Sequence, residues 1–383
     1  MSKTEKRNVP ALRFPEFQDE WVERRLEDLF IEFKSGKNIK ASKINDSGNY
    51  PVYGGNGLRG YTDIFSHDGE YFLIGRQGAL CGNINRFSGK AFVSEHAIAC
   101  RSNDFSDTEW LAQRLDYFNL NRLSESSAQP GLSVQKLLRF KLVVPTRSEA
   151  TKIATFLTSV DKKIAQVQEK KRLSQEFKKG MMQKLFSQQI RFKDDQGNDF
   201  PEWEEKRLGD ILIEYKERVD ANTNLPILTS SRNGLYPQKD YFANRELQNE
   251  GEYGVVPKGF FTYRHMSDDA TFKFNINEYC ERGAISKEYP VFTTKDYSAR
   301  FLYEILNNGS DFKRFALTQK QGGTRTRLYF KNLCKMVLSL PISQEATKIA
   351  TYLTALDDKI QNLENQIRQA KAFKQGLLQQ MLV

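Results

Sequence analysis

The chain has 383 residues, of which 39% are hydrophobic, and its formal net charge is +10; this size and composition suit two or three globular domains. No apolar run approaches the roughly 18 residues that a membrane span needs, and no apolar stretch behind Met1 marks a signal peptide. The four cysteines are scattered, which argues against a zinc site and a disulfide framework, so the sequence predicts a protein of the reducing cytoplasm without a membrane anchor.

The first block, residues 1–145, alternates short apolar runs with clusters of glycine. Residues 50–53 and 71–74 each precede such a cluster, which is the pattern of a strand that ends in a turn. Residues 108–123 carry apolar side chains at helical spacing and predict a helix. The block therefore favours an α+β domain. Its charges nearly balance, because residues 14–145 hold 16 basic and 17 acidic side chains.

A long helix is predicted over residues 146–186, where apolar side chains recur at intervals of four and three, the seam of a coiled coil. The helix holds ten basic and four acidic residues, so the basic excess of the chain lies here and supports nucleic-acid binding only weakly. Residues 187–199 are polar and are predicted to be a linker. The seam runs through Ile153, Leu157, Val160, Ile164 and Val167, and is weakened at Lys171, Ser174 and Lys178.

The second block, residues 200–341, is a further predicted α+β domain. Strands are expected near residues 225–229, 254–256 and 259–263, and a helix over residues 296–306. A second long helix follows over residues 342–383. Its seam runs through Ile349, Leu353, Leu356, Ile360, Leu363, Ile367, Ala370, Leu377 and Met381, with Lys374 as an interruption.

An internal repeat relates the two halves of the chain. The seven residues from Glu149 to Thr155 recur without change from Glu345 to Thr351, 196 positions later, and each copy follows a proline and opens a long helix. The sequence around Trp21 recurs around Trp203, but the blocks that these segments frame are unlike each other. The alternative interpretation, two ordinary amphipathic surface helices, does not explain why each pattern continues for about 40 residues.

The repeat also concerns the two ends of the chain. Residues 12–16 resemble an abridged form of the linker, so the start of the chain looks like the continuation of its end, and the termini are expected to lie close together. The predicted fold class is α+β: two α/β domains with mostly antiparallel sheets, separated by two long antiparallel coiled-coil helices, in a pseudo-twofold tandem repeat.

Catalytic and metal-binding patterns are missing from the sequence. The segment from Gly82 to Lys90 has the wrong spacing for a phosphate loop, and Ala91 stands where Ser or Thr is needed. His67, His96 and His265 show neither metal spacing nor a nucleophile, and each is predicted to be a satisfied or surface histidine. We therefore expect a non-catalytic chain that binds no cofactor or metal ion.

Candidate DNA contacts come from glycine-rich polar segments in both blocks. Arginine, glutamine and asparagine form paired hydrogen bonds with guanine and adenine edges, while serine, threonine and glycine amides suit phosphates. Each segment alone also fits an ordinary polar turn, so the presence of several in both blocks carries the prediction. The candidates are Gly55, Asn56, Arg59, Tyr61, Arg76 and Gln77 in the first block, and Ser230, Arg232, Asn233, Arg264, Gly323, Arg325 and Arg327 in the second.

On these features the chain resembles the specificity subunit of type I restriction-modification systems over nearly its whole length. The most specific motif is a proline followed by a helix that opens with an acidic residue and a Lys-Ile-Ala run, present twice. Family members often have Gln after that Glu, where this chain has Ala150 and Ala346. The glycine-rich segments of the two blocks look like two different variants of the family's target recognition domain.

The resemblance implies a function in which each recognition domain reads one half of a split site on double-stranded DNA. The two long helices are expected to set the spacing and to dock two methyltransferase subunits, which bind S-adenosylmethionine and flip an adenine for methylation. Two restriction subunits with ATP and Mg²⁺ complete the assembly, and the chain itself makes or breaks no covalent bond. The alternative is a bivalent coiled-coil scaffold without a DNA role; a fused methyltransferase-nuclease fails on length and missing motifs.

Overall fold

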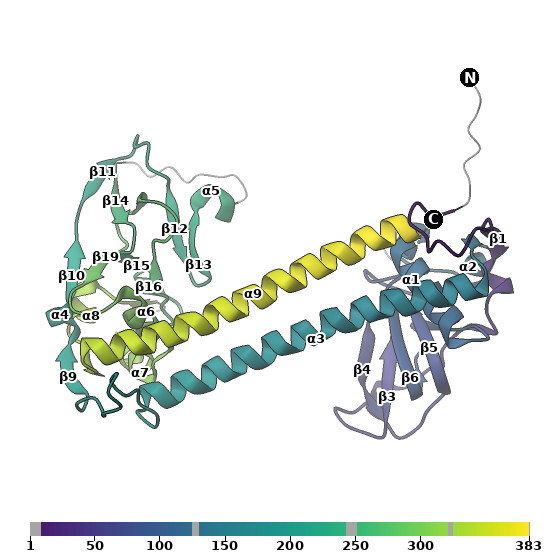
Figure 1. The fold of residues 1–383 in the computed structure, drawn as a ribbon, viewed down its shortest axis with the longest axis horizontal. Coiled ribbons are helices and arrows are strands. Elements are labelled where there is room, and N and C mark those ends of the chain that lie inside the picture. The colour runs from purple at the N-terminus through teal and green to yellow at the C-terminus, as the bar shows by residue number, and fades with distance from the viewer. Residues whose placement is uncertain (1–8, 125–129, 243–250, 321–324, 383) are drawn as a thin grey trace. The chain divides into compact units, whose positions relative to one another are not determined.

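The computed structural model describes residues 9–124, 130–242, 251–320 and 325–382. Its contacts divide the chain into two compact units, of which unit 1 is residues 1–169 and 364–383 and unit 2 is residues 170–363. Both boundaries fall inside long helices, α3 (Arg147–Phe186) and α9 (Ser343–Met381). Each unit therefore combines one β-rich block with a part of each long helix (Figure 1).

The two long helices confirm the coiled-coil prediction. They have 40 and 39 residues, or about 60 Å each at 1.5 Å per residue. Thr146 precedes α3 and its hydroxyl accepts a hydrogen bond from the Glu149 amide at 3.4 Å, the start signal of a helix. The predicted seam residues are buried or half-buried throughout, so the four-three spacing identified the inward face of both helices correctly.

Within each unit the two helices run antiparallel. In unit 1, the Lys374 ammonium lies 2.7 Å from Asp161, and Leu157 of α3 shares a core with Leu377 of α9. In unit 2, the Lys178 ammonium lies 2.7 Å from Asp357. The repeat places Asp357 and Lys374 196 positions after Asp161 and Lys178, so the same ion pair is formed once in each unit with the roles of the helices exchanged.

Unit 1 contains a six-stranded sheet with the order β2-β7-β5-β6-β3-β4, in which only β3 and β6 pair in parallel among the described strands. Helix α1 (Phe105–Phe118) packs on this sheet (Figure 1) through Trp110 and Leu115, which bury against Phe72. The strands are β2 (Glu32–Ser35), β3 (Tyr50–Gly54), β4 (Gly57–Thr62), β5 (His67–Gly75), β6 (Ile84–Val93) and β7 (Ala97–Arg101), with β1 (Val22–Arg25) paired to β8 (Lys141–Val144) and a short helix α2 (Val134–Leu138).

Unit 2 is built from smaller sheets, and every ladder among its named strands is antiparallel. Phe261, Phe274 and Phe292 fill its core beneath the helices α6 (Ala299–Asn308) and α7 (Ser310–Thr318). The sheets are β10 (Leu212–Tyr215), β19 (Val291–Thr294), β15 (Phe261–Thr262) and β17 (Asn275–Ile276); β11 (Arg218–Asp220), β14 (Glu252–Pro257) and β18 (Arg282–Ser286); β12 (Leu228–Ser231) with β13 (Gly234–Pro237); β16 (Met266–Ser267) with β20 (Thr326–Arg327); and β9 (Glu204–Arg207) with β21 (Val337–Leu340). The short helices are α4 (Leu208–Ile211), α5 (Gln238–Tyr241) and α8 (Phe330–Leu333).

The fold class is thus as predicted, while some element boundaries differ. The first predicted helix, residues 108–123, ends at Phe118 because Asn119 adopts a left-handed conformation with φ 59°, and a 3-10 turn follows at Leu120–Leu123. The second, residues 296–306, begins only at Ala299, since the Ser298 side chain accepts from the Phe301 amide and caps the helix there.

A pair of matching clusters joins each block to a long helix. In unit 1 the buried Glu149 carboxylate accepts from Arg13 at 2.6 and 2.8 Å and from the Trp21 indole at 3.1 Å. In unit 2 the buried Glu345 accepts from Arg191 at 3.2 and 2.9 Å and from Trp203 at 3.0 Å. We call these the junction clusters; they explain why the glutamate and the tryptophan recur in the sequence.

The junction clusters also revise the view of the linker and bear out the expectation for the chain ends. Arg191 belongs to the segment predicted to be a linker, yet it is anchored on Glu345, and the Asp194 carboxylate accepts from the Asn198 amide at 2.8 Å, so this segment folds as part of unit 2. Leu12 donates its amide to the Gln380 carbonyl at 2.8 Å. The described residues near the two ends of the chain therefore meet in unit 1, as the repeat predicts.

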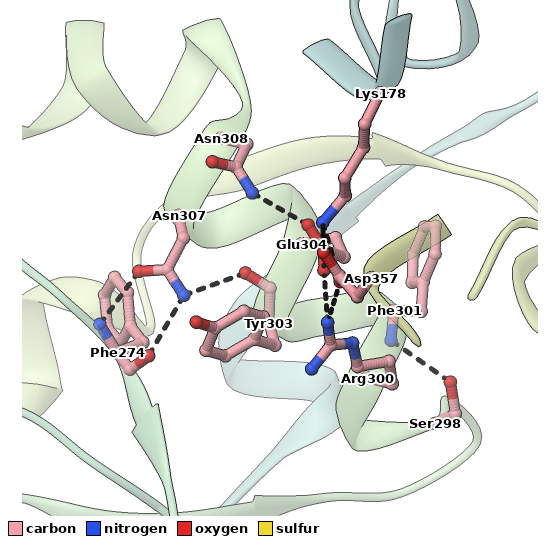
Figure 2. Close-up of polar contacts among 10 residues, drawn as sticks. All are labelled: Lys178, Phe274, Ser298, Arg300, Phe301, Tyr303, Glu304, Asn307, Asn308 and Asp357. Carbon is pink, nitrogen blue, oxygen red and sulfur yellow. Dashed lines mark hydrogen bonds and ion pairs between the residues drawn. The ribbon is translucent and has the colours of Figure 1, made fainter. Parts of the chain in front are cut away.

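A cluster of two carboxylates and two cations connects α6 to both long helices in unit 2 (Figure 2). Glu304 is 1% exposed and receives Arg300 at 2.9 Å, Lys178 of α3 at 3.4 Å and the Asn308 amide at 2.8 Å. Arg300 also pairs with Asp357 of α9. Three helices are thus linked through two carboxylates, Glu304 and Asp357, which share the cations of Lys178 and Arg300.

Candidate nucleic-acid interface

One recess of unit 2 is a hollow of about 750 Å³ whose lining is rich in polar side chains. It is formed where the turn after β12 meets the segments on both sides of β16. The turn lies more than 30 residues before β16 in the sequence. Four of the predicted DNA-contact residues line it, together with neighbours that the prediction did not include. The four are Ser230, Arg232, Asn233 and Arg264; the neighbours include His265, Ser267, Asp268, Thr271, Lys273 and Tyr289.

Arg232 is held at the rim of this hollow by a paired ion bridge. Its guanidinium donates to the two oxygens of Asp269 at 2.9 and 2.5 Å, while 56% of its side chain stays exposed. Hydrogen bonds from the Ser267 hydroxyl, from the Thr271 amide and from Arg232 hold the pKa of Asp269 well below its usual range. The carboxylate therefore stays charged, and it orients the arginine while leaving donors available to a ligand.

The remaining candidates of the second block lie beside the same hollow. Arg325 donates to Asp268 at 3.0 Å, and Arg327 pairs with Met266 across the β16–β20 ladder; Asp268 and Met266 both line the hollow. Gly323 lies outside the described residues. All the described candidates of this block, which come from three separate segments, are thus gathered around one recess.

His265 corrects a prediction, because it is neither a surface residue nor a fully satisfied one. It lines the hollow, its side chain is 5% exposed, and its Nδ1 has no hydrogen-bond partner among the described residues. Burial lowers the pKa of the imidazole, so the ring is neutral near pH 7. A neutral ring with an open nitrogen can exchange one hydrogen bond with a ligand. No spacing in the sequence pointed to it.

In unit 1, two predicted glycine-rich segments pack backbone against backbone. A Cβ on Gly55 would lie 2.8 Å from the His96 carbonyl oxygen, and one on Gly75 would lie 2.6 Å from the Gly55 carbonyl oxygen. Only glycine permits this approach. It brings Gly55 next to Arg76 and Gln77, whose side-chain oxygen lies 3.3 Å from His96 Nδ1. These candidates are therefore neighbours in space.

Arg76 and Gln77 also border a smaller hollow of about 350 Å³, which they share with residues 131–135. The Leu132 amide donates to the Arg76 carbonyl at 2.9 Å and fixes this edge. The described lining does not include Asn56, Arg59 or Tyr61, which belong to the β3–β4 hairpin. The structure thus places Gly55, in the turn of this hairpin, against Arg76 and Gln77, while Asn56, Arg59 and Tyr61 lie elsewhere on the same hairpin.

The described residues also bear on metal binding, on membrane spans and on the other two histidines. Among the residues that the structure describes, no three His, Cys, Asp or Glu side chains converge as metal ligands. Within the same residues, no helix has the length and apolar character needed to cross a membrane. His67 is buried, and its ring contacts Ser66 at 2.8 Å, whereas His96 is exposed, as predicted.

Comparisons with known proteins agree with this architecture. The family model for the type I restriction modification DNA specificity domain matches residues 18–175 and 201–372. The chain is 40% identical over 151 residues to the type I restriction enzyme EcoprrI specificity subunit of Escherichia coli, an alignment that spans 38% of each protein. It is 22% identical over 376 residues to a putative type I restriction enzyme specificity subunit, S.HindORF215P, of Haemophilus influenzae, which covers 91% of this chain and 92% of that one.

A solved structure supports the fold at full length. The S subunit of the type I restriction-modification system from M. genitalium superimposes with a TM-score of 0.64 at 15% identity, covering 98% of this chain and 99% of the other. The specificity-domain model matches once in each half of the chain, and both matched segments begin close to the duplicated tryptophans. The chain therefore belongs to the family of type I restriction-modification DNA specificity subunits, with one specificity domain in each half.

Proposed function

We propose that each β-rich block reads one half of a split site on double-stranded DNA, and that the hollow of unit 2 is one of the two reading surfaces. The observation that carries this proposal is the convergence of Arg232, Asn233, Arg264 and Ser230 on a single recess. Arginine and asparagine are the side chains that distinguish guanine and adenine in the major groove. Lys273 and the exposed arginines Arg325 and Arg327 add positive charge for the phosphates around it.

The paired bridge between Arg232 and Asp269 suits a base contact better than a phosphate contact. A guanidinium that is already oriented loses little side-chain entropy when it meets a guanine edge. Asp269 accepts hydrogen bonds and would repel a phosphate placed on the same side. In unit 1 the corresponding surface is formed by Arg76 and Gln77, and the buried Gly55 supports it by packing closely against the backbone of Gly75 and His96.

The partners and cofactors follow from the family. Family membership connects this chain with DNA and with other restriction-modification subunits. We further propose two methyltransferase subunits that carry S-adenosylmethionine, and two restriction subunits that use ATP and Mg²⁺, all acting with this chain in the cytoplasm. The chain itself contributes recognition and no catalytic group. Because α3 and α9 each contribute residues to both units, we propose that they set the unread gap of the DNA site.

The test is to express Arg232→Ala with the methyltransferase subunit encoded beside it and to map methylated bases by sequencing the host DNA. Loss of a base contact costs about 1–3 kcal/mol and relaxes one position of one half-site. Arg314→Ala is the matched control, since Arg314 is also an exposed arginine paired with an aspartate, Asp311 of α7, away from the hollow. Unchanged methylation in Arg232→Ala would reject the surface, and no sequence-specific methylation by the wild type would favour the scaffold alternative.

A further inference from the structure

The hollow of unit 2 contains a buried polar atom that the rest of the chain leaves without a partner. His265 lines the hollow, and its side chain is 5% exposed. Of the buried side-chain nitrogen and oxygen atoms in this lining, its Nδ1 is the one without a hydrogen-bond partner among the described residues. Leaving a buried polar atom unpaired destabilises the folded chain, so a group that enters the hollow and bonds to Nδ1 regains this energy.

The acidic groups around the hollow are engaged, in contrast to His265. The Asp269 carboxylate accepts from Arg232 at 2.9 Å, and the Asp268 carboxylate accepts from Arg325 at 3.0 Å. A metal ion is not the partner that the site suggests, because no three His, Cys, Asp or Glu side chains converge as ligands in the part of the chain that the structure describes. The open nitrogen therefore suits a hydrogen-bonding ligand.

The surroundings of the ring decide which nitrogen carries the hydrogen. The backbone of Glu288 forms a hydrogen bond with the ring that favours the protonated form, so the partner is the backbone carbonyl, and burial still lowers the pKa of the imidazole. A neutral ring carries a single N–H. Since Nδ1 has no partner, Nε2 is the nitrogen that donates to this carbonyl, and Nδ1 is left as a pure acceptor.

The position of the ring is fixed before any ligand arrives. It stacks on Tyr329, with ring centroids 5.7 Å apart and an angle of 26° between the planes. The His265 carbonyl accepts from the Leu328 amide at 2.8 Å, and the next residue, Met266, pairs with Arg327 across the β16–β20 ladder. An acceptor that is already oriented loses little conformational entropy when it binds.

An acceptor without a hydrogen distinguishes between the major-groove edges of the bases. Adenine and cytosine each present an amino group there, whereas guanine and thymine present acceptor atoms. Each base pair therefore holds one such amino group, on one strand, and the acceptor reads which strand carries it. Arg232 and Arg264 have donors only and suit guanine. His265 thus adds the opposite polarity to the same hollow.

We propose that His265 is a specificity-determining residue, whose Nδ1 accepts a hydrogen bond from the exocyclic amino group of one adenine or cytosine in the half-site read by unit 2. This inference rests on the proposed function, because it names the base chemistry that the hollow selects. It explains why an imidazole with an unpaired nitrogen lies among the predicted DNA-contact residues. It also gives the hollow a contact that the arginines cannot make.

The experiment measures binding of synthetic duplexes by the full chain in complex with the methyltransferase subunit encoded beside it. The methylated site is mapped first, and the half-site of unit 2 is the one that Arg232→Ala relaxes. Each adenine of this half-site is then replaced singly by purine, and each cytosine by 2-pyrimidinone, which removes the amino group alone. One such replacement should weaken binding by the wild type roughly tenfold, the effect of one lost hydrogen bond.

The same replacement should leave binding by His265→Phe unchanged, because phenylalanine keeps a ring against Tyr329 and has no acceptor. His265→Gln is a second variant, whose amide retains a donor for the Glu288 carbonyl, and melting temperatures establish that both variants fold. Amino-group removal in the half-site of unit 1 is the control and should affect the wild type and both variants equally.

Two results separate this inference from the proposed function. If every amino-group removal weakened the wild type and the His265 variants equally, His265 would not read a base, and the inference would be overturned while the hollow remained a reading surface. If the wild-type complex showed no preference for any DNA sequence, or if Arg232→Ala left the methylated site unchanged, the proposed function itself would be rejected.

Discussion

Unit 1 and unit 2 are joined to the long helices by the same chemistry, but their reading surfaces have little in common. Each unit has a buried glutamate that accepts from an arginine and a tryptophan, and each has an aspartate–lysine pair between α3 and α9. The β-rich blocks, in contrast, are a six-stranded sheet in one unit and several small sheets in the other. The comparison separates a common frame, which consists of α3, α9 and the two junction clusters, from two different β-rich blocks, the readers.

The contact between the long helices and the β-rich block is made by different side chains in the two units. In unit 1, Gln113 of α1 donates to Asp161 at 3.0 Å and is otherwise bonded to Glu109 at 2.9 Å. In unit 2, the corresponding contact is ionic, since Arg300 of α6 pairs with Asp357 and the buried Glu304 receives Lys178 (Figure 2). The aspartates and lysines of the helices are constant, so a new block needs only one helix that satisfies them.

The strongest test of the common frame is to remove the two junction glutamates. Glu149→Ala and Glu345→Ala should each destabilise their own unit by about 3–5 kcal/mol, because an arginine that is mostly buried and a tryptophan N–H are left without their acceptor. Both carboxylates are 0% exposed. Equal losses, measured by urea unfolding of the full chain, would support a true structural repeat.

Lys152→Ala is the control for this comparison, since Lys152 lies on the same turn of α3 and pairs with Glu16 at the surface. An exposed ion pair adds little to stability, so this variant should unfold close to the urea concentration of the wild type. If one glutamate variant cost no more than this control while the other lost several kcal/mol, the two junctions would not be equivalent.

Substitutions at the contact between the frame and each reader should reduce stability less than the junction variants do, and by different amounts in the two units. Glu304→Ala removes the acceptor of Lys178, Arg300 and Asn308 from a buried site and should cost unit 2 about 2–3 kcal/mol, the range for hydrogen bonds to charged groups. Asp357 still offsets the two cations, which keeps the loss below that of a junction glutamate. Gln113→Ala in unit 1 leaves Asp161 and Glu109 with their cationic partners Lys374 and Arg86, so no buried charge is left unpaired and the cost should be lower, about 1–2 kcal/mol. Thermal unfolding of both variants tests this order, and a larger loss for Gln113→Ala would contradict it.

The frame was predictable from the sequence because its signals are local or identical. Seven unchanged residues from Glu149 disclosed the repeat, and the four-three spacing disclosed the buried face of both helices. The junction clusters were not predicted, since Arg13 and Glu149 stand 136 positions apart and an Arg near a Trp has no characteristic spacing. The segment of Arg191 looked like a linker for the same reason.

The proposed reading surfaces were predictable only as a set of residue types. Glycine beside arginine marked turns that could approach DNA, and the structure gathered Arg232 and Arg264 at one hollow. The pairing of β16 with β20 decides which turns meet, and it joins Met266 to Arg327 and Ser267 to Thr326, which are far apart in the sequence. His265 and Asp269 were missed because a buried imidazole and a clamping carboxylate depend on that pairing. Their residue types carry no signal of their own.

The smallest expected effect compares the two buried histidines, one in each unit. His67 and His265 are 6% and 5% exposed, and burial is the main reason that the pKa of each lies below its ordinary value of 6.5. Glu32 opposes this shift at His67, as Glu288 does at His265, while Lys34 and Lys37, and Arg327 and Arg264, add to it. The unfolded chain therefore binds these protons more tightly than the folded chain.

Stability from these groups is present above pH 6.5 and is lost as the pH falls below that value, because protonation then favours the unfolded state. Replacing either histidine by asparagine should flatten the dependence of the free energy of unfolding on pH between about 7 and 5 in its own unit. His96→Asn is the control, since His96 is 46% exposed. Urea unfolding at several pH values measures the slopes.

Because His265 lines the hollow and its Nδ1 is open, His265→Asn should also weaken DNA binding, whereas His67→Asn should change stability alone. Equal loss of DNA binding in both variants would show that the hollow of unit 2 has no special part in recognition.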